Sequence, residues 1–360
     1  MRRLFVMGIA VIVLVAGCSG GLPTGVVYPS IEPLQGTPTT ITREFVFEGE
    51  PVSLTATVDS GIYDGAAAAE KTVTRFGNAR ENDWIEDYYP AFVEEEHQEP
   101  FFESVLAASR AVRDARGLDT DRYAELLTVF VQSLTYETDP VDLSPKFPVE
   151  TFVEGAGDCD DKTLLLAGLL AREGYDVAIM LFEAEQHVAL GIRSEDLPYE
   201  ATSYAFVETT NAGFIGMVPD TLAGGTVLGS EPRLFRIGEG ATPYTAGDDV
   251  RAILQAREQA VADATAMSAR IAAADAELAS LAAQTRSEAA RLESLKSSGR
   301  VAEYNAAVPA YNRLVEQYNQ SARDRNDLVA SYNAIVDLEA TIVDGLDDRA
   351  GTFAAVSAYR

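Results

Sequence analysis

The first half of the chain begins with alternating apolar and polar residues and then changes to a helical pattern. Residues 43–58 (REFVFEGEPVSLTATV) alternate around the segment EGEP, which predicts two short strands joined by a turn. From about residue 81 to 134 the apolar residues recur at three- and four-residue spacing, as in amphipathic helices. Asp119 and Thr120 are suitable caps for the second of these helices.

The middle of the chain predicts a loop, a helix and a series of strands. The segment PVETFVEGAGDCDDKTLLLAGLLAREGYDVAIML starts at Pro148, and its helix is expected over about residues 159–172. Asp158 is a favoured N-cap residue, and Gly174 is a common stop signal. Further strands are expected at residues 187–193 (HVALGIR) and 204–210 (YAFVETT). The sequence up to about residue 244 is rich in loops and completes the globular part.

From about residue 248 the chain predicts two long helices. The sequence becomes rich in Ala, Glu, Asp, Arg and Leu, and the segment SSG at 297–299 interrupts it with a tight turn. In the second helix an aromatic or arginine residue recurs every seven residues, each followed by asparagine, in a coiled-coil heptad. These pairs are Tyr304-Asn305, Tyr311-Asn312, Tyr318-Asn319, Arg325-Asn326 and Tyr332-Asn333. We therefore predict an antiparallel coiled-coil hairpin, whose asparagines either line a partner surface or set the register and face solvent.

Charge narrows the range of partners. The net charge is −28 with a pI near 4.3, which argues against nucleic acid as a partner. Lysine is rare, since it occurs only at Lys71, Lys146, Lys162 and Lys296. An acidic, lysine-poor surface suits a halophilic protein, because salt screens the self-repulsion. An acidic extracellular protein from an ordinary medium is an equally good interpretation.

The amino terminus predicts secretion and a lipid anchor. Arg2 and Arg3 precede a short apolar run over residues 4–16, as in a signal peptide. The run is shorter than the ~20 apolar residues of a spanning helix. The segment LVAGC, which ends at Cys18, resembles the lipobox of prokaryotic lipoproteins, in which the cysteine is lipidated. An uncleaved anchor is the alternative, and in both cases the rest of the chain lies outside the cytoplasm.

Cys159 and His187 are the candidates for thiol chemistry. A helix amino terminus lowers the pKa of a thiol, and backbone N–H groups there can bind an oxyanion. The aspartates at 158, 160 and 161 act in the opposite direction. His187 begins a predicted strand, from which its ring can serve as general base and acid. Glu208, on the next predicted strand, is expected to orient that ring, with Asn211 as the alternative.

The order and local sequence of these motifs resemble those of the transglutaminase-like superfamily of papain-fold proteins. The resemblance covers about residues 41–240 and rests on PVET, GDCDD, HVA and VETT, with FVQSLTYETD upstream. It implies that Cys159 is the nucleophile, His187 its base and Glu208 the orienting acid, although many members have Asp at the third place. No cofactor is expected, and no metal site either, because a single histidine with scattered carboxylates is not a zinc ligand set.

The predicted architecture follows from these assignments. We expect an α+β fold with a papain/transglutaminase-like core, in which the helix bearing the cysteine packs on an antiparallel sheet, followed by the helical hairpin. The predicted parts are the signal peptide with its lipidated cysteine (1–18), a flexible tether (19–40), the thiol domain (41–246) and the hairpin (247–360). Cys18 and Cys159 thus have separate roles, and no disulfide is expected.

Two functions compete at this point. The first is an enzyme in which Cys159 attacks an amide of a protein or peptide substrate, giving a thioester that water or an amine resolves. The second is a binding or scaffold lipoprotein, in which the hairpin contacts a protein partner and the thiol domain is inactive. Membership of a superfamily does not decide between them.

Overall fold

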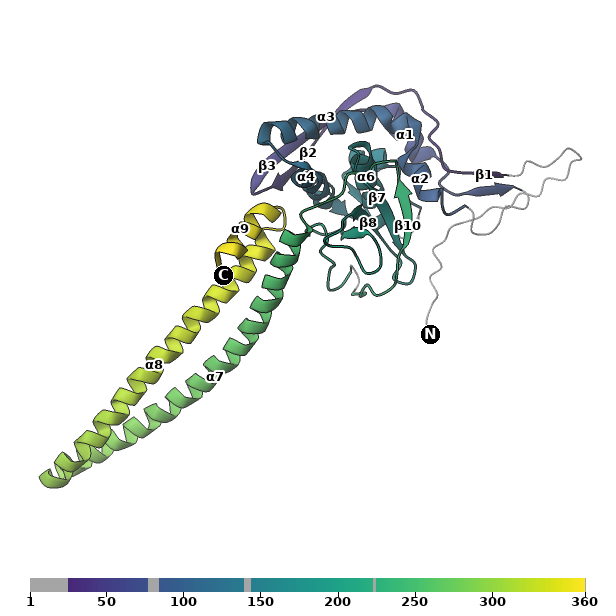
Figure 1. Cartoon of the computed structure of the whole chain (residues 1–360). Helices are drawn as coiled ribbons and strands as arrows, with labels where there is room; N and C mark the ends of the chain where they lie inside the picture. The colour runs from purple at the N-terminus through teal and green to yellow at the C-terminus, as the bar shows by residue number, and fades with distance from the viewer. Residues whose placement is uncertain (1–24, 77–83, 139–143, 223–224, 360) are drawn as a thin grey trace, which may run out of the picture. The chain divides into compact units, whose positions relative to one another are not determined.

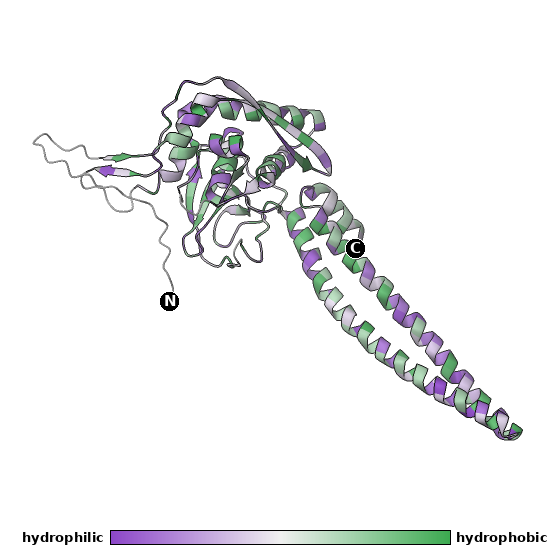
Figure 2. Ribbon diagram, turned by 180° about the vertical axis from the view of Figure 1, so that it is seen from behind, coloured by the Kyte–Doolittle hydropathy of each residue, from purple (hydrophilic) through white to green (hydrophobic). Residues whose placement is uncertain are grey.

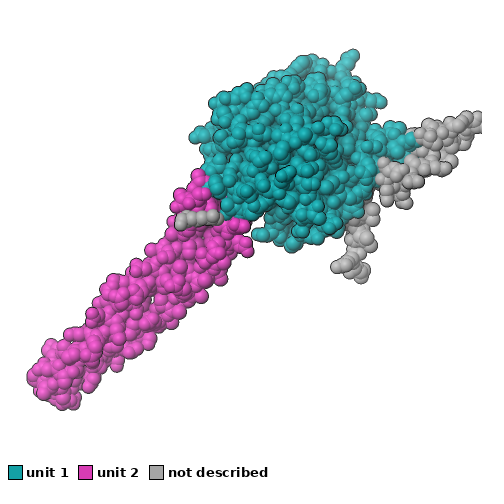
Figure 3. Space-filling model, in the orientation of Figure 1, with its two compact units in different colours: residues 1–252, 345–353 teal, residues 253–344, 354–360 magenta. Residues whose placement is uncertain are grey.

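The structure is a computed structural model that describes residues 25–76, 84–138, 144–222 and 225–359 (Figure 1). It has a mixed α+β fold with small, mostly antiparallel sheets and a long carboxyl-terminal helix pair, so the predicted α+β class and helix pair are confirmed. The chain divides into two compact units (Figure 3). Unit 1 contains residues 1–252 and 345–353, and unit 2 contains residues 253–344 and 354–360. The predicted signal peptide lies outside the described residues.

The strands follow the chain in this order: β1 (Gly25–Val27), β2 (Pro38–Phe47), β3 (Glu50–Asp59), β4 (Thr74–Phe76), β5 (Thr135–Tyr136), β6 (Ala156–Gly157), β7 (Val177–Phe182), β8 (His187–Arg193), β9 (Tyr204–Val207) and β10 (Arg233–Ile237). The helices are α1 (Ser60–Ala68), α2 (Tyr88–Val93), the 3-10 helix η1 (Glu96–Gln98), α3 (Glu99–Arg116), α4 (Thr120–Ser133), α5 (Pro148–Glu154), α6 (Cys159–Arg172), α7 (Gly247–Ser297), α8 (Val301–Asp344) and α9 (Arg349–Tyr359).

Helix α6 is the centre of unit 1, and it begins and ends where the sequence predicts. The Asp158 carboxylate accepts the Asp161 N–H at 3.3 Å, and the Asp161 carboxylate accepts the Asp158 N–H at 3.2 Å. This reciprocal capping box fixes the first turn. The leucines at 164, 165, 166, 169 and 170 are all fully buried, so the helix is covered on every side. Each such leucine contributes about 1.5–3 kcal/mol through burial.

An antiparallel sheet packs against α6, with strand order β10-β7-β8-β9. In its register Phe182 is opposite His187, and Leu190 is opposite Val207. Strand β10 lies in a region that the sequence predicted as loop. That prediction was wrong because the strand is short, although Phe235 and Ile237 alternate with polar residues and are both buried.

The hairpin β2–β3 forms as predicted, but its turn is tighter than expected. Glu48 and Gly49 have positive φ angles of 53° and 71°, which is typical of a two-residue hairpin turn. Pro51 therefore lies inside β3, opposite Val46. Arg43 of β2 donates to the carbonyl oxygens of Phe152 and Val153 at 2.7 and 2.6 Å, and so ties the hairpin to the end of α5.

The predicted flexible tether over residues 19–40 needs correction. Residues 25–27 form β1, which pairs with β4, and residues 38–40 belong to β2. Ile31 is only 2% exposed, and its N–H donates to the carboxylate of Glu95 at 3.4 Å. The many Gly, Pro and Thr residues of this segment are typical of a flexible linker, so the sequence did not indicate this packing. Any tether is confined to residues before 25.

Unit 2 is built on two long antiparallel helices, as predicted, with residues 298–300 between them. Apolar and polar residues alternate along both helices (Figure 2). Near the turn, Leu292, Leu295 and Ala307 are buried against the tyrosines of α8. All the asparagines of the heptad repeat are exposed, so they face solvent and do not set the register inside the seam.

The segment after α8 was not predicted as a separate element. Residues 345–353 return to unit 1, and α9 begins there. The Arg349 side chain is buried and donates to the carboxylates of Glu125 and Asp249, each at 2.6 Å. Tyr244 also donates to Glu125, at 2.7 Å. A buried carboxylate is thereby provided with partners from distant parts of the sequence.

The close packing of α6 on α3 generates a stability prediction. A Cβ atom at Gly168 would lie 2.4 Å from the ring of Phe102, which is fully buried and cannot move aside cheaply. Gly168→Ala should therefore lower the free energy of unfolding by about 1–3 kcal/mol in denaturant titrations, despite the better helix propensity of Ala. Gly229→Ala, where a Cβ meets nothing within 4 Å, is the matched control. Equal stability of both variants would contradict this packing argument.

Candidate active site

Cys159 is the first residue of α6, and the chain before it is held by backbone hydrogen bonds. The N–H groups of Thr135 and Glu137 donate to the carbonyl oxygens of Gly155 and Gly157, both at 3.0 Å. A Cβ at Gly157 would lie 2.6 Å from the Cβ of Asp161, so the capping box requires glycine at this position. The glycine-rich segment before Cys159 is therefore needed for the capping box, and not only for the approach of a substrate.

The thiol is held in its neutral form. Burial raises the pKa of the Cys159 thiol well above its ordinary value, and the carboxylates of Asp160 and Asp158 raise it further. The backbone N–H of Val188, which faces the sulfur, acts in the opposite direction. The sequence predicted this conflict between the helix amino terminus and the acidic neighbours, and in the structure burial and the neighbours prevail.

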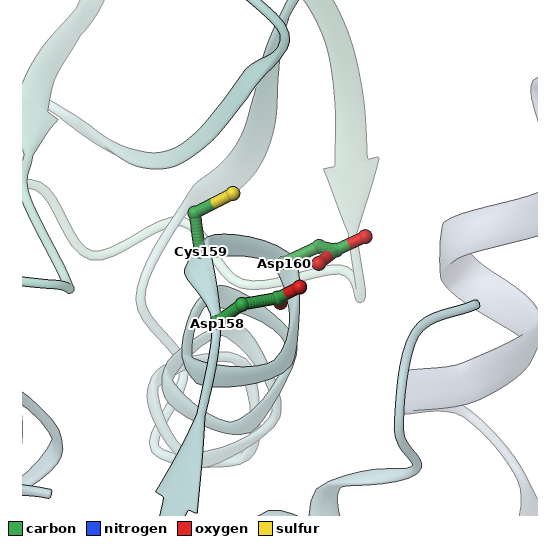
Figure 4. A group of neighbouring side chains, drawn as sticks. All are labelled: Asp158, Cys159 and Asp160. Atoms are coloured by element: carbon green, nitrogen blue, oxygen red, sulfur yellow. The ribbon is translucent and has the colours of Figure 1, made fainter. Parts of the chain in front are cut away.

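The aspartates around Cys159 belong to the helix start (Figure 4). The pKa of Asp160 lies well above its ordinary value because the group is buried and is hydrogen-bonded to Asp158. Burial, together with the charge of Asp158, raises the pKa of Asp161 to about 7. One ligand atom each of Asp158, Cys159 and Asp160 lies within 4.8 Å of the others. However, Asp158 already caps the helix, and the trio lacks the fourth ligand of a structural zinc site.

His187 and Glu208 lie side by side, as the sequence predicted. His187 Nε2 and Glu208 Oε2 are 3.5 Å apart, in side chains that are both almost fully buried. Over the described part of the chain neither atom has a hydrogen-bond partner. Burial opposes ionisation of Glu208, but the adjacent His187 ring and the hydrogen bonds from Thr210 outweigh it and hold the pKa of the carboxyl below its ordinary value. An ionised carboxylate therefore faces the imidazole.

Glu208 reaches this position from a turn and not from a strand. Strand β9 ends at Val207, one residue earlier than needed to include Glu208. The N–H and hydroxyl of Thr210 both donate to Glu208 Oε1, at 2.7 and 2.6 Å, and this local turn ends the ladder. Asn211, the alternative orienting residue, instead donates to the Thr210 hydroxyl at 3.3 Å.

The Cys159 thiol and the His187 ring both lie at the start of β8. The thiol comes from the first residue of α6, and the ring comes from the first residue of β8 itself. Nε2 of the His187 ring faces Glu208. The Cys159 sulfur lies against the N–H of Val188, the residue next to His187. Within the described residues no hydrogen bond joins the two side chains. Such bonds are often long in enzymes without substrate and shorten when substrate binds.

A buried lysine that was not predicted from the sequence lies behind the site. Lys162, one turn after Cys159, is fully buried, and its ammonium donates to the carbonyl oxygens of Gln132 and Leu134 at 3.2 and 2.9 Å. The Gln132 side chain in turn donates to the carbonyl oxygens of Glu208 and Gly213, at 2.8 and 3.0 Å. The end of α4 therefore links the cysteine helix to the segment that carries Glu208. The signal in the sequence that could have indicated this contact is a single lysine within a mostly apolar helix.

Comparisons of the chain with protein-family models, with curated proteins and with solved structures found no match in any of the three. The transglutaminase-like character of the core thus stays a prediction from the sequence motifs and the residues of the site. Among the described helices, none combines the length and the apolarity needed to cross a bilayer.

Lys162 generates a prediction for stability at alkaline pH. Burial lowers the pKa of Lys162 to about 8 from 10.5, with Glu208 acting in the opposite direction. Between these values the unfolded chain binds more protons, so the stability of the folded chain rises with pH. Relative to Lys162→Met, the wild type should gain about 3 kcal/mol in free energy of unfolding from pH 8 to 10.5. Lys296→Met, at an exposed position, should show no such trend in the same titrations. A pH-independent difference for Lys162→Met would contradict the assignment.

Proposed function

We propose that the chain is a membrane-anchored, extracytoplasmic amide hydrolase with a transglutaminase-like thiol site. Cys159 is the nucleophile, His187 the general base and acid, and Glu208 the group that orients the ring. The observation that carries the proposal is the 3.5 Å approach of two otherwise unpartnered, buried atoms, His187 Nε2 and Glu208 Oε2, at the strand end that the Cys159 sulfur also contacts. A carboxylate beside the ring stabilises the imidazolium that forms when a histidine takes a proton during the reaction.

The raised pKa of the thiol determines how the nucleophile forms. The resting site does not hold a thiolate, so the proton must leave as the sulfur attacks the carbonyl carbon of a bound amide. His187 takes that proton, and the ionised Glu208 stabilises the resulting imidazolium. The imidazolium then donates the proton to the leaving amine, which leaves a thioester on Cys159. The N–H of Cys159, which the capping box does not use, can hold the oxyanion of the tetrahedral intermediate.

Water resolves the thioester in the proposed reaction. His187 removes a proton from water as the oxygen attacks, and the thiol leaves with that proton returned. We propose hydrolysis in preference to acyl transfer to an amine because water needs no binding site of its own. The substrate is a protein or peptide at the outer face of the membrane, where the lipid on Cys18 would hold the enzyme.

The base role of His187 generates a prediction for thiol reactivity. At pH 7, His187→Ala should reduce the rate of iodoacetamide labelling of Cys159 at least about tenfold, because the half-buried thiol then lacks a proton acceptor. Peptide-level mass spectrometry separates this cysteine from Cys18. His97→Ala is the matched control, since this histidine pairs with Glu95 and its side chain is 37% exposed. Equal labelling of the wild type and His187→Ala would remove the enzyme proposal.

A scaffold role of unit 2 is favoured by a separate observation. Residues 264–291 of α7 and 308–334 of α8 include no buried side chain, so this stretch of seam is only partly covered. The exposed asparagines of α8 recur about every 10.5 Å along its axis. We infer that this face binds a protein partner, which adds to the enzyme proposal and would remain if that proposal failed.

Photocrosslinking of the full chain tests the scaffold role. A benzoylphenylalanine at Asn319 should give a discrete adduct on cells, and Cys159→Ala should leave that adduct unchanged. The same probe at Glu70, on the surface of unit 1, is the control position. Identical adducts from both positions would show general proximity and would contradict a specific hairpin surface.

A further inference from the structure

A cavity of about 290 Å³ lies in unit 1 on the side of the sheet that His187 shares. Its lining combines the carboxylate-bearing Glu200 with apolar residues, of which the argument uses Leu197, Tyr199, Phe206, Gly216, Val218 and Leu228. The volume is close to the lower limit of about 300 Å³ for small-molecule sites, so it suits one large side chain better than a whole ligand. Val218 is 40% exposed, and it marks the open rim.

Aromatic rings connect this cavity to His187. The ring of Phe182 lies 6.3 Å from the His187 ring, and it also lies 5.6 Å from Tyr199 and 6.1 Å from Phe206. Tyr199 and Phe206 are themselves part of the cavity wall. Strand alternation places His187 on the same face as Ala189, which is packed in this aromatic cluster. The cavity and the candidate base are therefore separated by a single ring.

The loop that carries Leu228 is fixed to the turn before His187. Glu185, in that turn, accepts hydrogen bonds from the N–H groups of Gly229 and Ser230 at 3.1 and 3.0 Å, and from the Ser230 hydroxyl at 2.5 Å. Leu228 in turn packs against the aromatic cluster. One carboxylate thus couples the position of a cavity wall to the strand that begins with His187.

The opposite wall depends on a glycine. Gly216 has a φ angle of +91°, and a Cβ there would lie 2.1 Å from the Cδ2 atom of Leu197. Its N–H donates to the carbonyl oxygen of Phe206 at 2.7 Å, which fixes this loop along the edge of β9. Both walls are therefore held by specific contacts with the strands of the site.

We propose that this cavity is the specificity pocket of the candidate enzyme and receives an aromatic or branched aliphatic side chain of the peptide substrate. The inference rests on the proposed function and names the substrate feature that the site selects. The apolar residues favour an uncharged side chain, and Glu200 in the lining disfavours an acidic one, because two carboxylates repel each other. The Phe182 ring contacts both the His187 ring and the cavity wall. We therefore assign the cavity to a side chain of the substrate and not to a separate ligand.

Reactive peptide probes test this pocket on the full chain. The probes are tripeptidyl acyloxymethyl ketones that carry Leu, Phe, Ala or Asp at each of the three positions in turn, and covalent addition to Cys159 is followed by mass spectrometry. At one position, Leu or Phe should label at least about tenfold faster than Ala, with Asp slower still. Val218→Trp, which fills the rim, should abolish that preference. Val227→Trp, at a 63% exposed position outside the wall, should retain it.

The outcomes separate this inference from the proposed function. His187-dependent iodoacetamide labelling with no preference among the probes at any position would overturn the pocket and leave the enzyme in place. A preference that Val218→Trp leaves intact would overturn it as well. Labelling that does not depend on His187 would instead remove the proposed function, whatever the side chain of the probe. Plain iodoacetamide labelling of Val218→Trp at the wild-type rate shows that this variant is folded.

Discussion

The reciprocal hydrogen bonds between Asp158 and Asp161 are the contact on which the site depends. They fix the first turn of a helix that is buried on all sides, and they require glycine at position 157. Because the helix cannot shift within its apolar surroundings, the sulfur of Cys159 has a fixed place at the end of β8. Burial and the carboxylates of Asp160 and Asp158 raise the pKa of the thiol. Asp158 thus both caps the helix and raises the pKa of the thiol at its first residue.

The residues behind the site show how three elements are held in register. Lys162 binds the carboxyl end of α4, and Gln132 at that end binds the backbone of Glu208. A buried ammonium that donates to helix carbonyls is favourably placed, because the carboxyl end of a helix carries partial negative charge. Its cost is desolvation, which appears as the lowered pKa. The cysteine helix and the orienting acid are therefore coupled through backbone groups, independently of substrate.

Local signals in the sequence predicted most of what lies near the nucleophile. Asp158 and Gly174 bracket the helix, and alternation locates β8, so the order of Cys159, His187 and Glu208 could be derived before any coordinates. Strand β10 and the ordering of Ile31 were missed because they depend on partners distant in sequence. Glu208 was expected near His187 and lies 3.5 Å from its ring, but the turn that presents Glu208 was not predicted, since it depends on hydrogen bonds from Thr210 that periodicity does not reveal. The role of Lys162 depends on the end of another helix.

The return of residues 345–353 to unit 1 has a consequence for how the protein can be divided. The carboxylate of Glu125 is buried, and Arg349 supplies its guanidinium partner from beyond the long helices. A chain cut before α7 would keep every residue of the thiol site and yet leave that carboxylate without its cation, at a cost of about 3–5 kcal/mol for a broken buried pair. A shortened chain should therefore join the start of α7 directly to the end of α8 and keep the terminal segment.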